Sequence, residues 1–223
     1  TVKLEEQVHE LMGDRPINLN SPEQLSWIIY SRKVNDKPVW SAAYEDRVSN
    51  TQHTDNIRRL TTKLYKQKAE RCNECYGSGQ IRKTRKDGTP HKNTNKCPTC
   101  SSTGFLYTNK KDFAGLKFIA PDYKWASANG FSTSKGNLIY LEGIARSRGM
   151  HDAEAFLQRV RRLSALDTYL SSFVEGIATH VKPDGMLHVR LLQHRTGTGR
   201  LSGADPNMQN MPRGGTFPVK KVF

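Results

Sequence analysis

Apolar residues recur every three or four positions in several stretches of the chain, and this spacing predicts helices. The longest predicted helix covers residues 152–181, and its apolar face comprises Phe156, Val160, Leu163, Leu166, Leu170, Phe173, Ile177 and Val181. Shorter helices are predicted over residues 3–12, 22–33 and 134–147. A basic helix is predicted over residues 55–71, where three apolar residues share one side: Ile57, Leu60 and Leu64.

Other stretches show strand or loop patterns. Residues 186–192 alternate apolar and polar side chains, as a strand does, and they follow a turn signal at Pro183-Asp-Gly185. Residues 35–53 and 112–129 show no regular period and are predicted to be irregular. The pattern as a whole predicts a mainly α fold with a small β edge near residue 190.

Four cysteines form two C-x-x-C pairs, Cys72 with Cys75 and Cys97 with Cys100, separated by 21 residues. Glycines follow each pair and allow the backbone to fold round the second sulfur. Two such pairs can offer four thiolates to one tetrahedral metal ion, which is the ligand set of structural zinc. We predict one structural Zn²⁺ bound by all four cysteines. Unbound or redox-active thiols are the alternative.

The formal net charge of +14 favours a polyanionic partner, since each neutralised phosphate releases counterions. Most of that charge lies in residues 54–111, which hold 14 Lys or Arg and four Asp or Glu. The loop between the cysteine pairs contributes four of these cations, which we predict to contact DNA: Arg82, Lys83, Arg85 and Lys86. A solvated basic loop or an acidic protein partner would explain the same charge.

Targeting signals are not evident in the sequence. No apolar run approaches the roughly 18 residues that a membrane span needs, and no segment resembles a signal peptide. We therefore expect a cytoplasmic protein without a membrane partner. In such a reducing compartment, paired cysteines bind metal more often than they form disulfides.

Residues 195–212 read R-T-G-T-G-R-L-S-G-A-D-P-N-M-Q-N-M-P, which resembles the first sequence motif of family A DNA polymerases, the polymerase I class. There the motif reads close to T-x-T-G-R-L-S-S-x-x-P-N-L-Q-N-I-P. Residues 4–25 and 131–134 resemble the start and the tip of that family's thumb. The cysteine pairs resemble the cysteine-rich domain of DnaJ-type chaperones. The polymerase resemblance covers about residues 1–34 and 130–223.

The resemblance implies a fold of three parts: a helical polymerase thumb, an inserted zinc ribbon and a small β edge of the palm at the C-terminus. It also implies a division of the chain. Residues 1–34 would be the helices leading into the thumb, and 35–129 a basic insertion with the ribbon at 72–104. Residues 130–182 would be the thumb tip and long helix, and 183–223 the start of the palm.

The resemblance further implies contacts with DNA. Four side chains match groups that lie along the primer-template minor groove: Arg200, Asn207, Gln209 and Asn210. The groove's acceptors look alike across base pairs, so such groups can bind any sequence. Arg161 matches a thumb arginine on duplex phosphates, although the family's lysine four positions later is Ala165 here. The thumb tip is matched by Ser132, Thr133 and Lys135, where a helix N-terminus can meet a phosphate.

The implied activity is that of a DNA-directed DNA polymerase in DNA replication. Nucleotidyl transfer uses Mg²⁺ held by palm aspartates. The first of these is expected after Phe223, so no catalytic residue is assigned. This chain alone is expected to bind no Mg²⁺ and to be inactive. The implied partners are primer-template duplex DNA and, if the polymerase is split, a palm-and-fingers polypeptide.

The insertion indicates a phage-type enzyme, and hence a bacterial or phage-infected cytoplasm. A processivity factor is a further candidate partner at the insertion. Two other functions stay open. One is a stand-alone zinc-ribbon DNA-binding accessory protein that carries the motif. The other is a chaperone-like zinc module, which does not explain residues 200–212.

Overall fold

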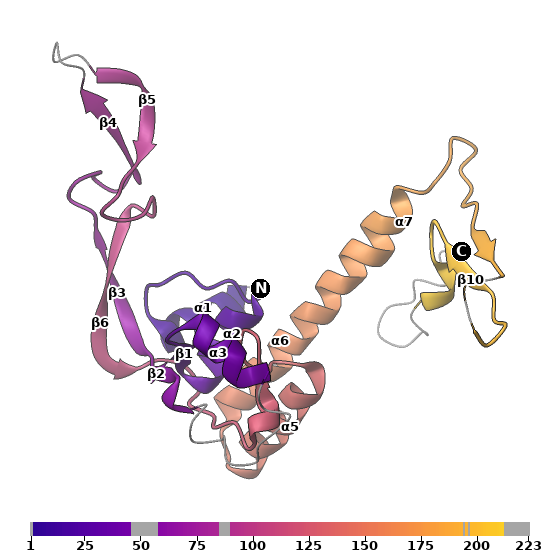
Figure 1. Ribbon diagram of the computed structural model, residues 1–223, viewed down its shortest axis with the longest axis horizontal. Helices are drawn as coiled ribbons and strands as arrows, with labels where there is room; N and C mark the ends of the chain where they lie inside the picture. The colour runs from indigo at the N-terminus through magenta and orange to yellow at the C-terminus, as the bar shows by residue number, and fades with distance from the viewer. Residues whose placement is uncertain (1, 46–57, 85–89, 194, 196, 212–223) are drawn as a thin grey trace. The chain divides into compact units, whose positions relative to one another are not determined.

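The computed structural model describes residues 2–45, 58–84, 90–193, 195 and 197–211 (Figure 1). The chain forms two compact units, Thr1–Val160 and Arg161–Phe223, which are described separately below. Within the described residues, no helix is both long enough and apolar enough to cross a membrane.

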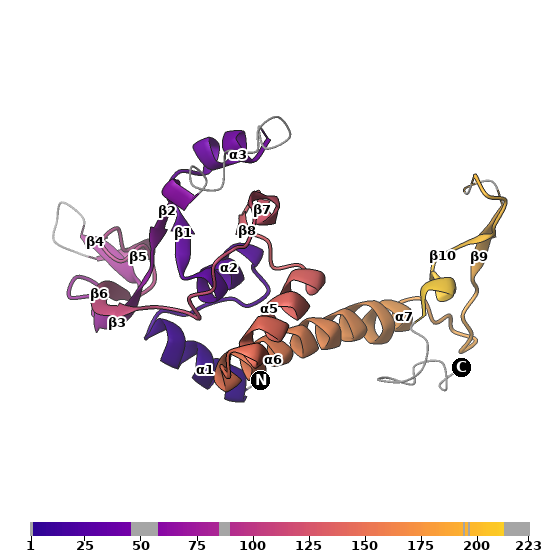
Figure 2. The same ribbon diagram turned by 90° about the horizontal axis from the view of Figure 1, so that it is seen from below.

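The first unit contains a body of helices. They are α1 (Val2–Met12), α2 (Pro22–Tyr30), α3 (Lys37–Glu45), α5 (Lys135–Ser147) and the first part of α6 (His151–Tyr169). Their apolar faces meet in a core whose largest fully buried side chains include Trp40, Phe156, Ile28, Ile29, Leu141 and Leu157. Figure 2 shows α5 and α6 side by side, and Arg146 Nε donates to Glu154 Oε1 between them at 2.8 Å.

Two predicted helices are confirmed, and a third is shorter than predicted. Helices α1 and α5 cover the predicted ranges 3–12 and 134–147. Helix α2 ends at Tyr30 because Ser31 takes a left-handed conformation, with φ of 54°. The chain then enters strand β1 (Arg32–Val34), which pairs with β2 (Thr61–Lys63) in antiparallel register.

The prediction of an irregular segment over residues 35–53 is wrong for its described part. Residues Lys37–Glu45 form α3, and Trp40 is almost completely buried. The Trp40 indole donates to the Ser127 carbonyl and packs edge-on against Phe131, with ring centroids 5.6 Å apart. This distant aromatic partner fixes the helix, and the local spacing does not reveal it.

The predicted helix over residues 55–71 is also wrong. Its described part mostly forms strands, namely β2 and β3 (Tyr65–Arg71). Strand β3 pairs with β6 (Phe105–Phe113), and Tyr65 stacks on Phe113 across that pair at 4.8 Å. These pairings with distant strands override the helical spacing of Leu60 and Leu64, while Ile57 lies outside the described residues.

The β3–β6 ribbon leads from the helical body to the cysteine pairs, and a second hairpin follows beyond them (Figure 1). That hairpin joins β4 (Gln80–Thr84) to β5 (Pro90–Lys96). The ribbon is attached to the body at the end of α1. There the Asp14 amide donates to Gln67 O at 2.8 Å, and the Ala69 amide donates to Asp14 Oδ2 at 2.9 Å.

After β6 the chain returns to the body. Residues 114–120 have no regular structure, as predicted, but Ala114, Leu116 and Phe118 are buried against it. A short helical turn, η2 (Tyr123–Trp125), precedes two paired two-residue strands, β7 (Ala126–Ser127) and β8 (Gly130–Phe131). The prediction of an irregular segment over residues 112–129 is therefore wrong at the end of β6 and at η2 and β7.

The second unit begins within helix α6, at Arg161. After α6 come a π-helical stretch, η3 (Leu170–Glu175), and α7 (Gly176–Ala178), so the helical run ends three residues before the predicted residue 181. Gly185 N donates to Lys182 O at 2.8 Å, which confirms the predicted turn. The predicted strand is shorter than 186–192: β9 (Arg190–Leu192) pairs with β10 (Ser202–Ala204), and η4 (Met208–Asn210) follows.

Candidate metal centre and nucleic-acid interface

The four cysteines converge as predicted. All four are buried, and their Sγ atoms lie within 4.8 Å of one another. The Sγ atoms of Cys72 and Cys97 are 3.9 Å apart, and those of Cys75 and Cys100 are 3.6 Å apart. A tetrahedral ion with Zn–S bonds of about 2.3 Å requires sulfurs about 3.8 Å apart. The four side chains therefore fit one metal ion such as zinc.

The two cysteine pairs have the same local geometry. The Gly79 amide donates to Cys75 Sγ, and the Gly104 amide donates to Cys100 Sγ, both at 3.3 Å. Both glycines have positive φ, 69° and 76°, and lie against backbone of the other pair. A Cβ at Gly79 would be 2.3 Å from Ser102 O. These positions therefore require glycine for both conformation and space.

Each cysteine pair also holds the other in place. The Cys72 amide donates to Gly104 O at 2.9 Å, and the Cys97 amide donates to Gly79 O at 3.0 Å. Hydroxyl groups repeat as well, since Ser78 Oγ donates to the Cys75 carbonyl and Thr103 Oγ1 donates to the Cys100 carbonyl, each at 2.6 Å. Backbone and hydroxyl hydrogen bonds thus hold the two cysteine pairs in the positions that bring the four sulfurs together.

The electrostatic environment of the thiols differs within the cluster. Burial raises the pKa of Cys100 to about 11. Burial also acts to raise the pKa of Cys75, but hydrogen bonds from the Gly79 amide and the neighbouring thiols outweigh it, and the pKa falls to about 7. A bound cation favours the thiolate form of every ligand, so metal binding releases protons and weakens as the pH falls.

The predicted DNA contacts of the first unit lie in two places. Ser132 and Thr133 are half-buried before α5 and Lys135 is exposed in its first turn, where Ser134 caps the helix by accepting from the Asn137 amide. Arg82 is exposed on β4, and Lys83 follows it in the same strand. Arg85 and Lys86 lie outside the described residues.

In the second unit the structure brings together two of the predicted groove-binding amides. Asn207 Oδ1 accepts from the Gln209 amide at 3.2 Å, and Gln209 Oε1 accepts from the Gly203 amide at 3.3 Å. These contacts fold the motif back against β10. Arg200 is exposed just before β10, Arg161 is half-buried on α6, and Asn210 belongs to η4.

The sequence interpretation missed an exposed aromatic pair on the ribbon. Tyr65 and Phe113 stack across β3 and β6, and Lys63 Nζ lies 5.0 Å from the centroid of the Phe113 ring. Exposed aromatic rings beside lysines are side chains on which nucleic-acid bases can stack. Residues 65–71 show no alternation of apolar and polar side chains, and the pair forms only through the pairing of β3 with β6.

No protein-family model matches the chain. Curated proteins named DNA polymerase I match parts of it. The protein from Streptococcus pneumoniae strain TIGR4 is 48% identical over 91 residues, covering 41% of this chain and 9% of that protein. The Bacillus subtilis strain 168 protein is 37% identical over 84 residues, covering 37% and 8%. The thermostable enzyme of Thermus filiformis is 39% identical over 82 residues, covering 36% and 9%.

The matches are partial on both sides. Part of the chain is therefore related to DNA polymerase I, and this supports the resemblance to family A polymerases. The chain spans less than a tenth of the length of these relatives.

Proposed function

We propose that this chain is the primer-template binding portion of a phage-type family A DNA polymerase that acts in DNA replication. It would comprise the thumb and the first palm motif. The observation that carries the proposal is the motif at residues 195–212, in a chain that is partly similar to DNA polymerase I of several bacteria. The hydrogen bond from the Gly203 amide of β10 to Gln209 Oε1, and that from the Gln209 amide to Asn207 Oδ1, support a defined conformation for that motif.

The division into thumb and palm follows the boundaries that the resemblance implies. The helices up to residue 34 and those from 130 to 182 form the thumb, and residues 183–223 begin the palm. Residues 35–129 form the inserted basic segment with its zinc ribbon. The fold class is then mainly α, with strands concentrated in the insertion and at the palm edge.

The proposed DNA contacts separate by chemistry. Arg200 donates to minor-groove acceptors at the primer end, and Asn207, Gln209 and Asn210 add amide groups there. Arg161 and the α5 N-terminus with Ser132, Thr133 and Lys135 contact duplex phosphates. The resemblance assigns no catalytic carboxylate to the described residues, and we assign nucleotidyl transfer and Mg²⁺ binding to the complete enzyme. A separate palm-and-fingers chain would provide them if the polymerase is split.

The ion proposed for the four cysteines is a single structural zinc. Bound there, it would supply the cross-link that holds the two cysteine pairs together, and four thiolates would leave it no open coordination position. The basic residues of the insertion would then belong to a segment whose fold the metal stabilises. We propose that Arg82, Lys83, Arg85 and Lys86 contact DNA phosphates, with a processivity factor as the alternative partner of this segment.

The main test is substitution of Arg200 in the complete enzyme. Arg200→Ala is expected to reduce primer extension more than it reduces affinity for primer-template duplex, because the contact matters most at the primer end. Lys182→Ala is the control, since Lys182 is exposed in the same unit and outside the motif. Equal effects of the two substitutions on extension would contradict the proposed role of Arg200.

The insertion requires a separate test. Neutralising Arg82, Lys83, Arg85 and Lys86 together should weaken binding to all sequences and flatten the salt dependence by roughly one unit for each lost phosphate contact. An unchanged salt slope would indicate a protein partner for this segment.

A stand-alone DNA-binding accessory protein is the second candidate, favoured by the exposed aromatic pair beside Lys63. Mixing the chain with a palm-and-fingers polypeptide distinguishes the two functions. Restored primer extension supports a split polymerase, and failure of the two chains to associate favours an accessory role or an excised fragment.

A further inference from the structure

Two arginines of the helical body, Arg32 and Arg58, lie together and have no acidic partner among the described residues. Arg32 on β1 uses its Nη1 to donate to Thr61 Oγ1 at 3.0 Å, Thr61 O at 3.3 Å and Arg58 O at 3.4 Å. Arg58 uses its Nη2 to donate to Ala120 O at 3.3 Å. Both side chains are half-buried, and within the described part of the chain neither forms an ion pair with a carboxylate.

This arrangement is unusual for cationic side chains. A partly buried charge loses hydration and is normally compensated by an opposite charge. Here the hydrogen-bond acceptors are neutral oxygens, and each guanidinium donates to them through one of its terminal nitrogens. A guanidinium carries five N–H donors. Donors therefore remain on both Arg32 and Arg58 for a ligand.

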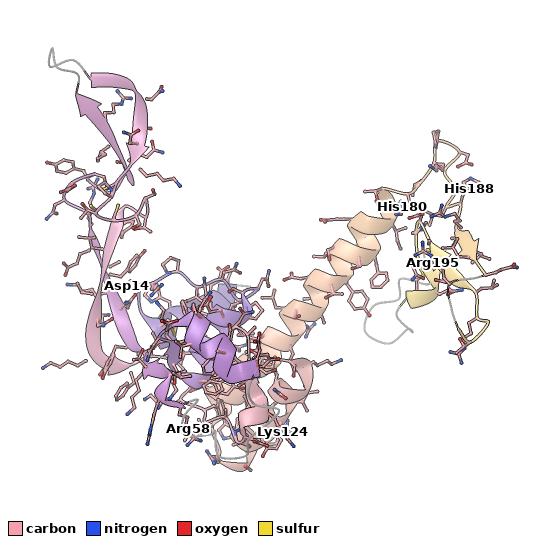
Figure 3. The ribbon with its side chains drawn as sticks, viewed as in Figure 1. Asp14, Arg58, Lys124, His180, His188 and Arg195 are labelled. Carbon is pink, nitrogen blue, oxygen red and sulfur yellow. The ribbon has the colours of Figure 1, made fainter. Side chains whose placement is uncertain are left out.

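The two arginines line one small cavity. Tyr30, Phe118 and Phe131 form much of its wall, and its volume is about 80 Å³. One water needs about 10–15 Å³ by such a measure, whereas sites for drug-sized ligands measure about 300–1,000 Å³. The cavity therefore has room for a single small oxyanion. Figure 3 labels Arg58 on the helical body, away from the cysteine pairs.

The surroundings add positive charge. Arg32 lies directly opposite Lys63 in the β1–β2 pair, an arrangement of like charges that destabilises a sheet when nothing compensates it. Burial raises the pKa of Tyr30, so its hydroxyl stays neutral, and it donates to Ser132 O at 2.8 Å. An anion in the cavity would thus meet two guanidinium groups and no described negative group.

We propose that Arg32 and Arg58 bind a phosphate group in this cavity. Planar guanidinium groups recognise phosphate oxygens through paired, charge-assisted hydrogen bonds. The phosphate can come from a nucleic-acid backbone or from inorganic phosphate, and both present the same tetrahedral oxyanion. The proposal does not depend on the polymerase function, since it concerns a pocket in the helical body alone.

The first experiment measures thermal unfolding of the full chain in inorganic phosphate and in chloride at matched ionic strength. Phosphate is expected to raise the Tm of the wild type, because a ligand that binds only the folded state stabilises it. Arg58→Gln should weaken the apparent phosphate affinity about tenfold or more, the loss expected for a charge-assisted contact. Arg59→Gln is the matched control, because Arg59 is the exposed neighbour and does not line the cavity.

The second experiment identifies the source of the phosphate by measuring binding to primer-template duplex over a series of salt concentrations. If Arg58→Gln lowers duplex affinity and the salt slope by about one, the site holds a backbone phosphate. If only the response to inorganic phosphate is lost, the site holds free phosphate. The proposal is overturned if phosphate stabilises the wild type no more than chloride does, or if Arg58→Gln and Arg59→Gln respond alike. If Arg58→Gln does not fold, Arg58→Lys takes its place in both experiments. Lysine keeps the positive charge but lacks the paired N–H donors of the guanidinium, so its phosphate affinity should also fall.

Discussion

The helical body and the cysteine module of the first unit owe their stability to different sources. The cysteine module is defined here as residues 72–104. In the body, large apolar side chains such as Phe156, Ile28 and Trp40 are almost completely buried. In the module, the buried cluster consists of the four cysteines, and among the described residues the partly buried apolar side chains packed beside it are Ile81 and Leu106. A hydrophobic core holds the first, while the buried cluster of the second is four cysteines that could bind a metal ion.

The difference shows why one chain can combine a helical core with a polar, basic extension. Apolar burial contributes about 25 cal/mol per Å², so a segment with few apolar side chains cannot offset its conformational entropy. A structural zinc can replace that contribution, because its binding free energy becomes folding free energy. Such a module needs few apolar side chains, and its described cations Arg82 and Lys96 are exposed.

Metal removal should produce the largest difference in stability between the module and the helical body. Chelation is expected to melt residues 72–104 and leave the helices folded, because binding on the order of 10–16 kcal/mol is lost only from the module. Metal analysis, circular dichroism and hydrogen exchange of the two regions check this. Cys72→Ser should reproduce the effect without a chelator. A chelated chain that loses all helicity would show that the two regions are not independent.

The module could be predicted from sequence because its determinants are local. Each cysteine pair and its glycine lie within eight residues, and the same hydrogen bonds recur in both copies. The body was harder to predict, because distant contacts decide it. Helix α3 depends on packing of Trp40 against Phe131, and strand β3 depends on pairing with β6 about 40 residues later.

The candidate sites divide in the same way. The cysteine cluster and the motif at residues 195–212 could be recognised because each lies within a short, continuous stretch of sequence. The Arg32–Arg58 pair could not be found, since the two residues are 26 positions apart and meet only through the β1–β2 pairing. Arg58 lies in a short helical turn just before β2, and the prediction of a helix over residues 55–71 did not reveal that a strand opposite β1 follows it.

Truncation in the body should show the reverse effect to chelation. Phe156→Ala is expected to cost about 3–5 kcal/mol, because the side chain is fully buried and its removal leaves a cavity. Thermal or urea unfolding of the helices measures the loss. The metal content of the module should not change. Ile139→Ala removes an apolar side chain that is 47% exposed on α5 and should cost far less.

A smaller effect is expected from glycine substitution in the module. Gly104→Ala places a Cβ 2.4 Å from Gly77 O and demands a positive φ, so it adds a steric clash to a conformational cost of about 1–2 kcal/mol. Zinc affinity, measured by competition with a chelator, should fall. Gly185→Ala is the control, because Gly185 also has positive φ but no neighbour within 4 Å. Equal losses of zinc affinity would contradict the role of close packing at Gly104.

The smallest predicted effect concerns the joint between the two regions. Asp14, labelled in Figure 3, accepts from the Ala69 amide of the ribbon. That hydrogen bond is the main cause that holds the pKa of Asp14 below its usual value of 3.8, and Lys110, His9 and Lys68 add to it. Because the folded-state pKa is lowered, the contact contributes fully above the unfolded-state pKa. The contribution disappears as the pH falls through the folded-state value, below about 4.

Hydrogen exchange of the Ala69 amide between pH 6 and pH 2 measures this loss. Acid also releases metal from the thiolates, so the ribbon can loosen for a second reason. Asp14→Asn separates the two causes, because asparagine keeps an acceptor oxygen that does not titrate. In Asp14→Asn, the hydrogen-exchange protection of the Ala69 amide should then change only over the pH range in which the thiols would release a metal ion. If both proteins lose protection over the same pH range, the Asp14 carboxylate does not control the attachment of the β3–β6 ribbon to the body.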